Sequence, residues 1–332
     1  MARILVTGGA GYIGSHTCKA LALAGYEPVT FDNLSTGFRD LVRWGPCVEG
    51  DIRDAAALRA VFKAFAPEAV IHFAGRIAVG ESVVAPALHY QINVAGTLCL
   101  LDALRDAGVG RVVFSSSAAV YGLPAKSPVP ESQPLAPINP YGRTKLAVEQ
   151  VLLDYRAAYG LRSVSLRYFN AAGADPAGES GELHHPETHL IPLALDAVLN
   201  PNRRLALYGD DYATPDGTCI RDYIHVSDLA QAHVMALRLL EAESTPAAMN
   251  VGTGYGYSIR EVLNAIERVT GRVVPHDVAP RRIGDPPALV GDSTLLRRLT
   301  GWAPAHSDID TIIRTAWAWH QAHRNPGQPR VD

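Results

Sequence analysis

The stretch "RILVTGGAGYIG" (Arg3–Gly14) decides the fold of this chain. Its apolar start predicts a buried strand, and Gly8, Gly11 and Gly14 follow at three-residue spacing before a predicted helix. Glycines at these positions permit a tight turn and let the backbone approach a pyrophosphate at the helix N-terminus. Because the motif stands between a strand and a helix, it predicts a dinucleotide site rather than a glycine-rich turn without a ligand.

An acidic residue follows at the end of the next predicted strand. The run "PVTFD" ends at Asp32, which comes 18 positions after Gly14. A carboxylate there can accept from both ribose hydroxyls and repels a 2′-phosphate. The predicted cofactor is therefore NAD rather than NADP.

Short apolar runs alternate with helical patterns through the first half of the chain. This alternation predicts an α/β fold with a doubly wound parallel Rossmann sheet covered by helices on both faces. The predicted strands after Asp32 are Cys47–Asp51, Ala69–Gly75, Arg111–Ser117 and Ser163–Phe169, and two long helical segments span about Pro86–Ala107 and Asn139–Tyr159.

The amino-acid composition changes after Asn170, where a loop rich in glycine, proline and polar residues begins. We expect a Rossmann domain over 1–170 and a smaller C-terminal α/β substrate domain over 171–332. The boundary stays open, because late segments such as Ile220–Asp228 are candidates to return to the Rossmann sheet.

Charge and cysteine content narrow the class of protein. The 332 residues include 30 basic and 33 acidic side chains, for a net charge of −3, so we expect neither nucleic acid nor an anionic membrane as a partner. No apolar run reaches the roughly 18 residues of a membrane span, and the start has no signal-peptide layout. The four cysteines, scattered and without a C-x-x-C pair, suggest reduced thiols in a cytoplasmic protein: Cys18, Cys47, Cys99 and Cys219.

A second motif, "NPYGRTK" (Asn139–Lys145), predicts a catalytic pair. Asn139 is a suitable N-cap and Pro140 suits the first helical position. Tyr141 and Lys145 then lie one turn apart on the same helix face. A cationic neighbour and the positive end of a helix both favour the tyrosine phenolate. The alternative is a buried Tyr–Lys stripe without a chemical role.

Several segments, in order along the chain, resemble those of one family. They are GGAGYIGSH, VEGDI, IHFAG, AVGES, FSSSAAVYG, NPYGRTK, RYFN, RDYIHV and APRRIGD. Together they resemble the UDP-glucose 4-epimerases (UDP-galactose 4-epimerases) of the extended short-chain dehydrogenase/reductase superfamily. The resemblance runs from Gly8 to about Leu289, and it implies an NAD-dependent interconversion of UDP-glucose and UDP-galactose through a 4-keto sugar. It also implies that 171–332 binds the UDP-sugar and that the chain forms a homodimer through its two long helical segments.

The resemblance assigns roles to individual residues. Tyr141 is the implied acid/base, Lys145 its electrostatic partner and Ser117 the hydrogen-bonding third member. The implied cofactor contacts are Gly8, Gly11, Tyr12, Ile13, Gly14, Asp32, Asn33, Ser35, Asp51, Ile52, Phe73, Ala74, Gly75, Asn93, Ser115, Tyr141, Lys145 and Phe169. The implied substrate contacts are Ser117, Tyr141, Asn170, His189, Leu190, Ala206, Leu207, Tyr208, Arg221, Tyr223, Arg282, Asp285 and Leu289.

The chain departs from the family pattern at four positions in or next to the predicted sites. Ile77 replaces a usual lysine, so one cofactor phosphate contact is either lost or supplied by the neighbouring Arg76. Ala119 lacks a hydroxyl that helps to hold the sugar. His189 stands where asparagine is usual, and we expect a neutral hydrogen-bonding imidazole there. Leu289 replaces a tyrosine found in some members, which predicts room for a 2-acetamido group and activity on UDP-GlcNAc and UDP-GalNAc.

Three other interpretations were weighed against the epimerase. A 4,6-dehydratase needs further acid/base groups, but Ala118 and Ala119 stand where related dehydratases have an acidic pair. A 4-reductase needs an exchangeable cofactor, and a non-catalytic NAD-sensing protein does not need the Tyr–Lys pair. No metal site is expected, because the histidines of the 171–189 loop lack cysteine partners and helical spacing: His184, His185 and His189.

Overall fold

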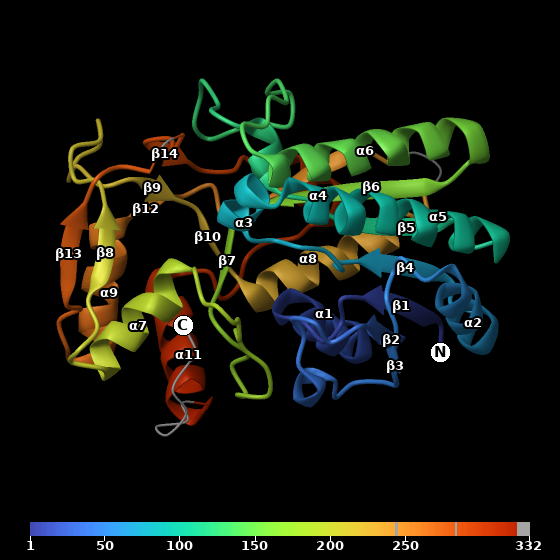
Figure 1. The fold of residues 1–332 in the computed structure, drawn as a ribbon, viewed down its shortest axis with the longest axis horizontal. Coiled ribbons are helices and arrows are strands. Elements are labelled where there is room, and N and C mark those ends of the chain that lie inside the picture. Colours follow the sequence, from blue (N-terminus) through green and yellow to red (C-terminus); the bar gives the residue numbers. More distant parts are fainter. Residues whose placement is uncertain (243–244, 283, 324–332) are drawn as a thin grey trace.

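A computed structural model describes residues 1–242, 245–282 and 284–323. A seven-stranded, all-parallel sheet forms its larger part (Figure 1). The strand order is β11-β6-β5-β4-β1-β2-β3. The strands are β1 (Arg3–Thr7), β2 (Glu27–Asp32), β3 (Cys47–Glu49), β4 (Ala69–His72), β5 (Arg111–Ser115), β6 (Arg162–Tyr168) and β11 (Ala248–Val251). The predicted doubly wound Rossmann sheet is confirmed.

Helices cover both faces of this sheet, so its strand residues alternate between two apolar cores. Ile4 and Val6 pack with residues of α1 and α8, whereas Leu5 packs with residues of α2, α5 and α6. A strand buried on both faces needs apolar residues throughout, which is why these runs lack polar alternation. The helices are α1 (Tyr12–Leu23), α2 (Ala55–Phe65), α5 (Thr97–Asp106), α6 (Pro140–Tyr159) and α8 (Val226–Leu239).

The long helix predicted over 86–107 is continuous but not uniform. It consists of α4 (Pro86–His89), a π-helical turn η2 (Tyr90–Gly96) and α5, and it follows the short α3 (Val79–Val84). The π-helical turn contains Asn93, a predicted cofactor residue. Single π-turns are frequent at functional sites, and nothing in the apolar spacing distinguishes one from an ordinary helical turn. Two short 3₁₀ segments are η1 (Arg39–Leu41) and η3 (Ala118–Tyr121).

Small sheets and further helices make up most of the chain after Asn170 (Figure 1). The strand groups are β7 (Asn170–Ala172) with β10 (Tyr223–His225), β8 (Leu205–Tyr208) with β13 (His276–Ala279), and β12 (Tyr257–Ser258), β9 (Ile220–Arg221) and β14 (Ala288–Leu289). The helices are α7 (Leu190–Leu199), α9 (Ile259–Thr270), α10 (Thr294–Thr300) and α11 (Ile309–His323).

One late strand joins the large sheet, but it is not the predicted one. Ile220–Asp228 forms β9, β10 and the start of α8 instead of a Rossmann strand. Strand β11 pairs in parallel with β6 at the sheet edge. Its run is short and contains Asn250, whose buried side chain binds loop carbonyls, so the apolar pattern alone does not reveal it. The division at residue 170 stays a prediction. Within the described residues, no helix combines the length and apolar character of a membrane span.

Candidate active site

The predicted catalytic pair lies in the first turns of α6. Asn139 caps this helix as expected, since its Oδ1 accepts from the Gly142 N–H at 2.8 Å, and Pro140 occupies the first position. Tyr141 is 8% exposed and Lys145 is 4% exposed. A buried lysine without a carboxylate partner is costly, so its position needs a compensating contact.

That contact comes from the end of strand β5. Lys145 Nζ donates to the main-chain oxygen of Ser115 at 2.8 Å and lies 5.8 Å from the centre of the Tyr141 ring. Burial lowers the pKa of Lys145 to about 8, and the nearby Glu149 carboxylate opposes this change. The ammonium form still predominates at neutral pH. The helix therefore holds a cation beside the phenol.

The acidity of Tyr141 differs from the sequence prediction. Burial raises the pKa of Tyr141 above its usual value, and a hydrogen bond with Ser117 opposes the rise. The prediction that Lys145 and the helix N-terminus lower this pKa is wrong for the protein alone, because loss of water around the phenolate outweighs them. The phenolate needs further positive charge nearby.

A buried polar network lies behind the pair. Glu149 is bonded by Arg167 through Nε at 2.9 Å and Nη2 at 2.5 Å, and it accepts from Ser116 Oγ at 2.5 Å. Arg167 also donates to Tyr121, whose hydroxyl reaches Asn250 Oδ1 at 2.7 Å. Sequence analysis missed this network. The one signal of this network in the sequence is an acidic residue four positions after Lys145, the predicted catalytic lysine.

The glycine turn is shaped for an anion. Gly8 has φ +74°, and a Cβ on Gly14 would lie 2.1 Å from the Gly8 oxygen, so side chains are excluded at both. Helix α1 begins at this turn, with neither a side-chain cap nor an acidic residue in its first turn. Its free N–H groups and positive dipole end fit a pyrophosphate. The residues present therefore fit a dinucleotide.

Asp32 lies beside this turn and is 8% exposed. Its Oδ2 accepts from the Ala10 N–H at 3.0 Å and its Oδ1 from the Leu34 N–H at 2.9 Å. Burial raises the pKa of this carboxyl, and the two amides oppose the rise. Each oxygen keeps a further lone pair for a hydroxyl, as the ribose prediction requires.

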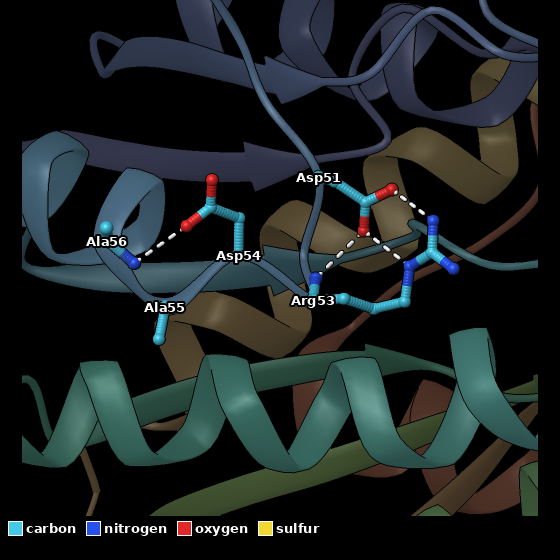
Figure 2. A pocket seen from close by; sticks show the side chains of 5 residues that line it. All are labelled: Asp51, Arg53, Asp54, Ala55 and Ala56. Carbon is cyan, nitrogen blue, oxygen red and sulfur yellow. Dashed lines mark hydrogen bonds and ion pairs between the residues drawn. The ribbon is translucent and has the colours of Figure 1, made fainter.

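Another predicted cofactor residue, Asp51, lies in a surface pocket. The pocket is lined by Asp51, Arg53, Asp54, Ala55 and Ala56 (Figure 2). Asp51 pairs with Arg53, with Nη2 to Oδ2 at 2.7 Å, and this guanidinium holds the pKa of Asp51 well below its usual range. Asn33 Nδ2 also donates to Asp51 at 3.0 Å, which links two predicted residues from β2 and β3. The pocket does not contain the catalytic pair.

Asn93 fixes the backbone after β4. Its Oδ1 accepts from the Arg76 N–H at 2.7 Å and its Nδ2 donates to the Arg76 oxygen at 3.0 Å. A Cβ on Gly75 would lie 2.9 Å from Asn93 Oδ1. Arg76 itself pairs with Glu81, and Ile77 is 45% exposed. The suggested replacement of a phosphate contact by Arg76 therefore competes with an ion pair.

The remaining predicted cofactor residues lie on the same elements. Phe73 follows β4 and packs against His233 with ring centres 4.7 Å apart and ring planes tilted by 44°. The Tyr12 hydroxyl donates to the Gly173 oxygen at 2.6 Å, so the start of α1 is joined to the 171–189 loop. Ile13 lies on α1. Ser35, Ile52 and Ala74 follow β2, β3 and β4 in that order, and Phe169 follows β6.

Predicted substrate residues gather on the small sheets. Arg221 is 9% exposed and pairs with Asp285. Leu289 on β14 stands opposite Arg221 on β9. The Arg282 guanidinium lies 4.0 Å from the centre of the Tyr208 ring, and Tyr208 is 40% exposed, so this tyrosine is not a core residue.

Other predicted substrate residues have structural contacts of their own. Asn170 Nδ2 donates to the Asp222 oxygen at 3.0 Å, across the β7–β10 pair that also contains Tyr223. Tyr223 is buried, which raises the pKa of its hydroxyl. Ala206 and Leu207 lie on β8, and Leu190 is the first residue of α7. The Ala119 N–H donates to Ser117 Oγ at 3.1 Å.

His189 is not the neutral imidazole that sequence analysis predicted. Its Nδ1 lies 2.9 Å from Glu182 and 2.8 Å from Glu187, and these two carboxylates raise the pKa of His189 to about 10. The same carboxylates raise the pKa of His184 to about 9. Both imidazoles are therefore protonated at neutral pH. The prediction considered the histidines alone and missed Glu182 and Glu187, although "ELHHPETH" places both acids within the same segment.

A profile of the NAD dependent epimerase/dehydratase family matches residues 4–252. The chain belongs to this family. NAD is accordingly the cofactor of this family member, in agreement with the shape of its glycine turn.

Known members of this family resemble the chain along nearly its whole length. A UDP-glucose 4-epimerase of Rhizobium leguminosarum bv. trifolii is 54% identical over 317 residues, which cover 96% of this chain and 97% of that protein. A crystal structure of UDP-glucose 4-epimerase from Brucella ovis in complex with NAD has a TM-score of 0.93 at 56% identity, covering 96% of this chain and 98% of that one. The Bifidobacterium longum enzyme in complex with NAD+ and UDP has a TM-score of 0.92 at 38% identity, covering 97% and 99%.

Proposed function

We propose that Tyr141 is the acid/base, with Lys145 and Ser117 as its partners, in the NAD-dependent interconversion of UDP-glucose and UDP-galactose that this chain catalyses. The activity rests on the full-length likeness to UDP-glucose 4-epimerases. The observation that supports the residue roles is the buried group at the carboxyl end of β5. There the Ser117 hydroxyl opposes the rise in the pKa of Tyr141, and Lys145 Nζ lies 5.8 Å from the centre of the Tyr141 ring.

Tyr141 removes the proton of the sugar 4-hydroxyl and returns it after the sugar has turned over. The hydride from C4 is accepted by NAD when that cofactor is bound and is returned to the opposite face of the 4-keto sugar, without net redox change. Ser117 donates to the phenolic oxygen or to the sugar oxygen at each step. Lys145 contributes the positive charge that the buried phenolate requires, and a bound oxidised nicotinamide would supply further positive charge.

Arg221 and Arg282 are the proposed ligands of the UDP diphosphate. Arg221 lies on β9 opposite Leu289, and Arg282, between β13 and β14, lies against the Tyr208 ring. Guanidinium forks match pairs of phosphate oxygens. Arg221 is already paired with Asp285, so binding exchanges one anionic partner for another. Holding the nucleotide while leaving the hexose free allows the 4-keto sugar to rotate.

One assay tests the function and the residue roles together. Purified protein is incubated with UDP-glucose or UDP-galactose, the products are resolved by sugar, and absorbance is followed at about 340 nm, where NADH absorbs. We expect interconversion without accumulating free NADH. Tyr141→Phe should lower the rate by roughly 10²–10⁴-fold while NAD stays bound. Free NADH would favour a 4-reductase, a dehydrated product a 4,6-dehydratase, and no turnover an NAD-sensing protein.

We also propose activity on UDP-GlcNAc and UDP-GalNAc. Leu289 lies in the apolar group that contains Tyr121 and Phe169, beside Arg221, so its size limits the space for the sugar. A Campylobacter jejuni protein described as a UDP-Glc/GlcNAc 4-epimerase is 40% identical to this chain, with a TM-score of 0.85.

A homodimer is the proposed assembly. Large apolar side chains are exposed on the two adjacent helical segments through which we predict the dimer forms. They include Tyr90, Leu98, Leu153 and Tyr159. The segments lie side by side along one edge of the molecule (Figure 1) and are joined by Tyr155, whose hydroxyl donates to Asp102 at 2.9 Å. Apolar surface of this kind commonly marks a protein interface.

A cytoplasmic location is the proposed compartment. The four cysteines are free thiols, as a reducing environment requires. Fractionation of source cells should recover the protein with a cytosolic marker enzyme. Recovery with membranes or with secreted protein would contradict this location.

A further inference from the structure

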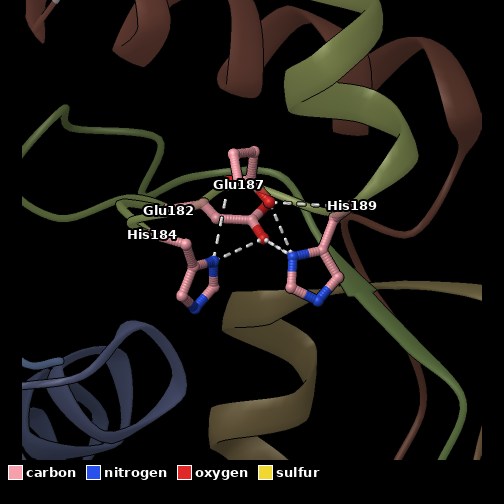
Figure 3. A group of neighbouring side chains, drawn as sticks. All are labelled: Glu182, His184, Glu187 and His189. Atoms are coloured by element: carbon pink, nitrogen blue, oxygen red, sulfur yellow. Dashed lines mark hydrogen bonds and ion pairs between the residues drawn. The ribbon is translucent and has the colours of Figure 1, made fainter. Parts of the chain in front are cut away.

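Two histidines and two glutamates converge between the 171–189 loop and helix α7. They are Glu182, His184, Glu187 and His189, and their ligand atoms all lie within 4.8 Å of one another. Figure 3 shows both imidazoles presenting Nδ1 to the carboxylate oxygens from the same side. The set is therefore built by folding, because no two of its members share a helix.

Three of the separations are close to those between ligand atoms around a small cation. His189 Nδ1 lies 2.9 Å from Glu182 Oε1 and 2.8 Å from Glu187 Oε1, and His184 Nδ1 lies 3.2 Å from Glu182 Oε1. Bonds of roughly 2.0–2.2 Å in a tetrahedral zinc site place neighbouring ligand atoms about 3.3 Å apart. Imidazole and carboxylate are both ordinary zinc ligands.

Burial makes the two carboxylates dependent on a cation. The side chain of Glu187 is 4% exposed and that of Glu182 is 9% exposed. In the parts of the chain that the structure describes, neither carboxylate has an ion pair with lysine or arginine; their ion-pair partners are His184 and His189. Two adjacent buried anions repel one another unless positive charge lies between them.

The orientation of His184 favours a metal ion over a hydrogen bond. Its Nδ1 is buried and 3.2 Å from Glu182, yet it makes no hydrogen bond of acceptable geometry. A metal ligand directs its nitrogen lone pair at the centre of the group rather than along a line to one oxygen. The ring is held in this position by edge-to-face contact with Tyr12, with centres 6.2 Å apart.

We propose that Glu182, His184, Glu187 and His189 form a structural zinc site. Zinc would take the place of the two imidazole protons and neutralise both buried carboxylates. It would join the loop to the first turn of α7, since His189 is the residue before that helix and caps it with no side-chain bond. The Trp319 indole N–H donates to the main-chain oxygen of Glu182 at 3.2 Å, so α11 holds the backbone of the site.

The first test is the metal content of the whole chain, purified without a metal-affinity step. The protein is exposed to equimolar Zn²⁺, dialysed, and analysed by inductively coupled plasma mass spectrometry. We expect about one zinc per chain. Co²⁺ in place of Zn²⁺ should give the intense visible absorption of a tetrahedral site. Less than a tenth of an equivalent of zinc, or a Co²⁺ spectrum of the octahedral aquo ion, would overturn the proposal.

Variants separate this site from weak surface binding. Glu187→Gln and His184→Ala should each lower the affinity for Zn²⁺ by at least about tenfold, because even outer-shell partners commonly contribute that much. His185→Ala is the matched control, since this exposed histidine lies in the same loop but outside the group. Equal zinc affinity in all three variants would overturn the proposal. If the ligand variants do not fold, the zinc stoichiometry and Co²⁺ spectrum of the unmodified chain still decide it.

Discussion

Glu149 and Arg167 form a two-pronged ion pair inside the protein, one helical turn beyond Lys145. The Arg167 nitrogens lie 2.9 and 2.5 Å from the two Glu149 oxygens. The side chain of Arg167 is 6% exposed and that of Glu149 is 7% exposed. Glu149 also raises the pKa of Lys145 against the effect of burial. The pair therefore connects strand β6 to helix α6 and contributes to the charge of Lys145, the proposed catalytic lysine.

Glu149→Gln should destabilise the protein and change the pH dependence of its activity. An unpaired buried Arg167 costs about 3–5 kcal/mol of the free energy of unfolding. Without the carboxylate the pKa of Lys145 falls further, so Lys145 loses its proton at lower pH. Urea denaturation and a pH–rate profile measure the two effects. Asp154→Asn, at an exposed position on the same helix, is the control and should change neither. An unchanged pH–rate profile with normal stability would show that Glu149 does not support Lys145.

Gly14→Ala should prevent NAD binding. The added Cβ would lie 2.1 Å from the Gly8 oxygen, so the turn must open and its N–H groups lose their alignment. Overpacking of this kind typically costs about 1–3 kcal/mol. Bound NAD after gel filtration and the midpoint of thermal unfolding are the measurements. Gly110→Ala, which meets no atom within 4 Å, should retain both properties. Full NAD occupancy in Gly14→Ala would contradict the role of this turn.

The local sequence was sufficient for much of this site. The glycine spacing, the Asn139 cap and the Tyr141–Lys145 pair are each encoded within a few consecutive residues, and the structure places all three as expected. Their geometry is set by single turns, which sequence patterns describe well.

Features that depend on contacts between distant segments could not be predicted from local sequence patterns. The pKa of Tyr141 rises because distant segments exclude water from it. Asn250 meets Tyr121 only after β11 has joined the sheet, more than a hundred positions later in the chain. In each case the missing information was which segments pack together.

Lowering the pH should reduce the free energy of unfolding through His233, which is fully buried beside Phe73. Burial lowers the pKa of His233 to about 4, against 6.5 for an exposed histidine. Between these values the unfolded chain binds a proton that the folded chain does not. The free energy of unfolding therefore falls as pH decreases from about 6.5 to 4, by up to about 1.4 kcal/mol per pH unit for this group.

Comparison with His233→Leu isolates this contribution. Urea denaturation at pH 7, 6 and 5 should show a smaller loss of stability on acidification in the variant than in the unmodified chain. His276→Leu, a half-buried position outside this core, is the control. Parallel pH dependences in all three proteins would mean that His233 titrates normally.

Leu289→Tyr should restrict the sugar pocket. If Leu289 leaves room for a 2-acetamido group, the larger side chain lowers kcat/KM for UDP-GlcNAc by at least about tenfold, while that for UDP-galactose changes little. Product analysis with both substrates measures this ratio. Undetectable turnover of UDP-GlcNAc by unmodified enzyme that is active on UDP-galactose would end the proposal.

Leu153→Asp should convert the proposed dimer to a monomer. Leu153 is 47% exposed on α6, next to the segment that contains Leu98, and a carboxylate buried between two subunits loses its water without gaining a partner. Light scattering at micromolar concentration should give twice the chain mass for the unmodified protein and about half of that for the variant. Val273→Asp places the same charge on an apolar side chain that is 66% exposed after α9, and it should leave the dimer intact. A monomeric mass for the unmodified protein would exclude the dimer, and a dimeric Leu153→Asp would place the interface on another face.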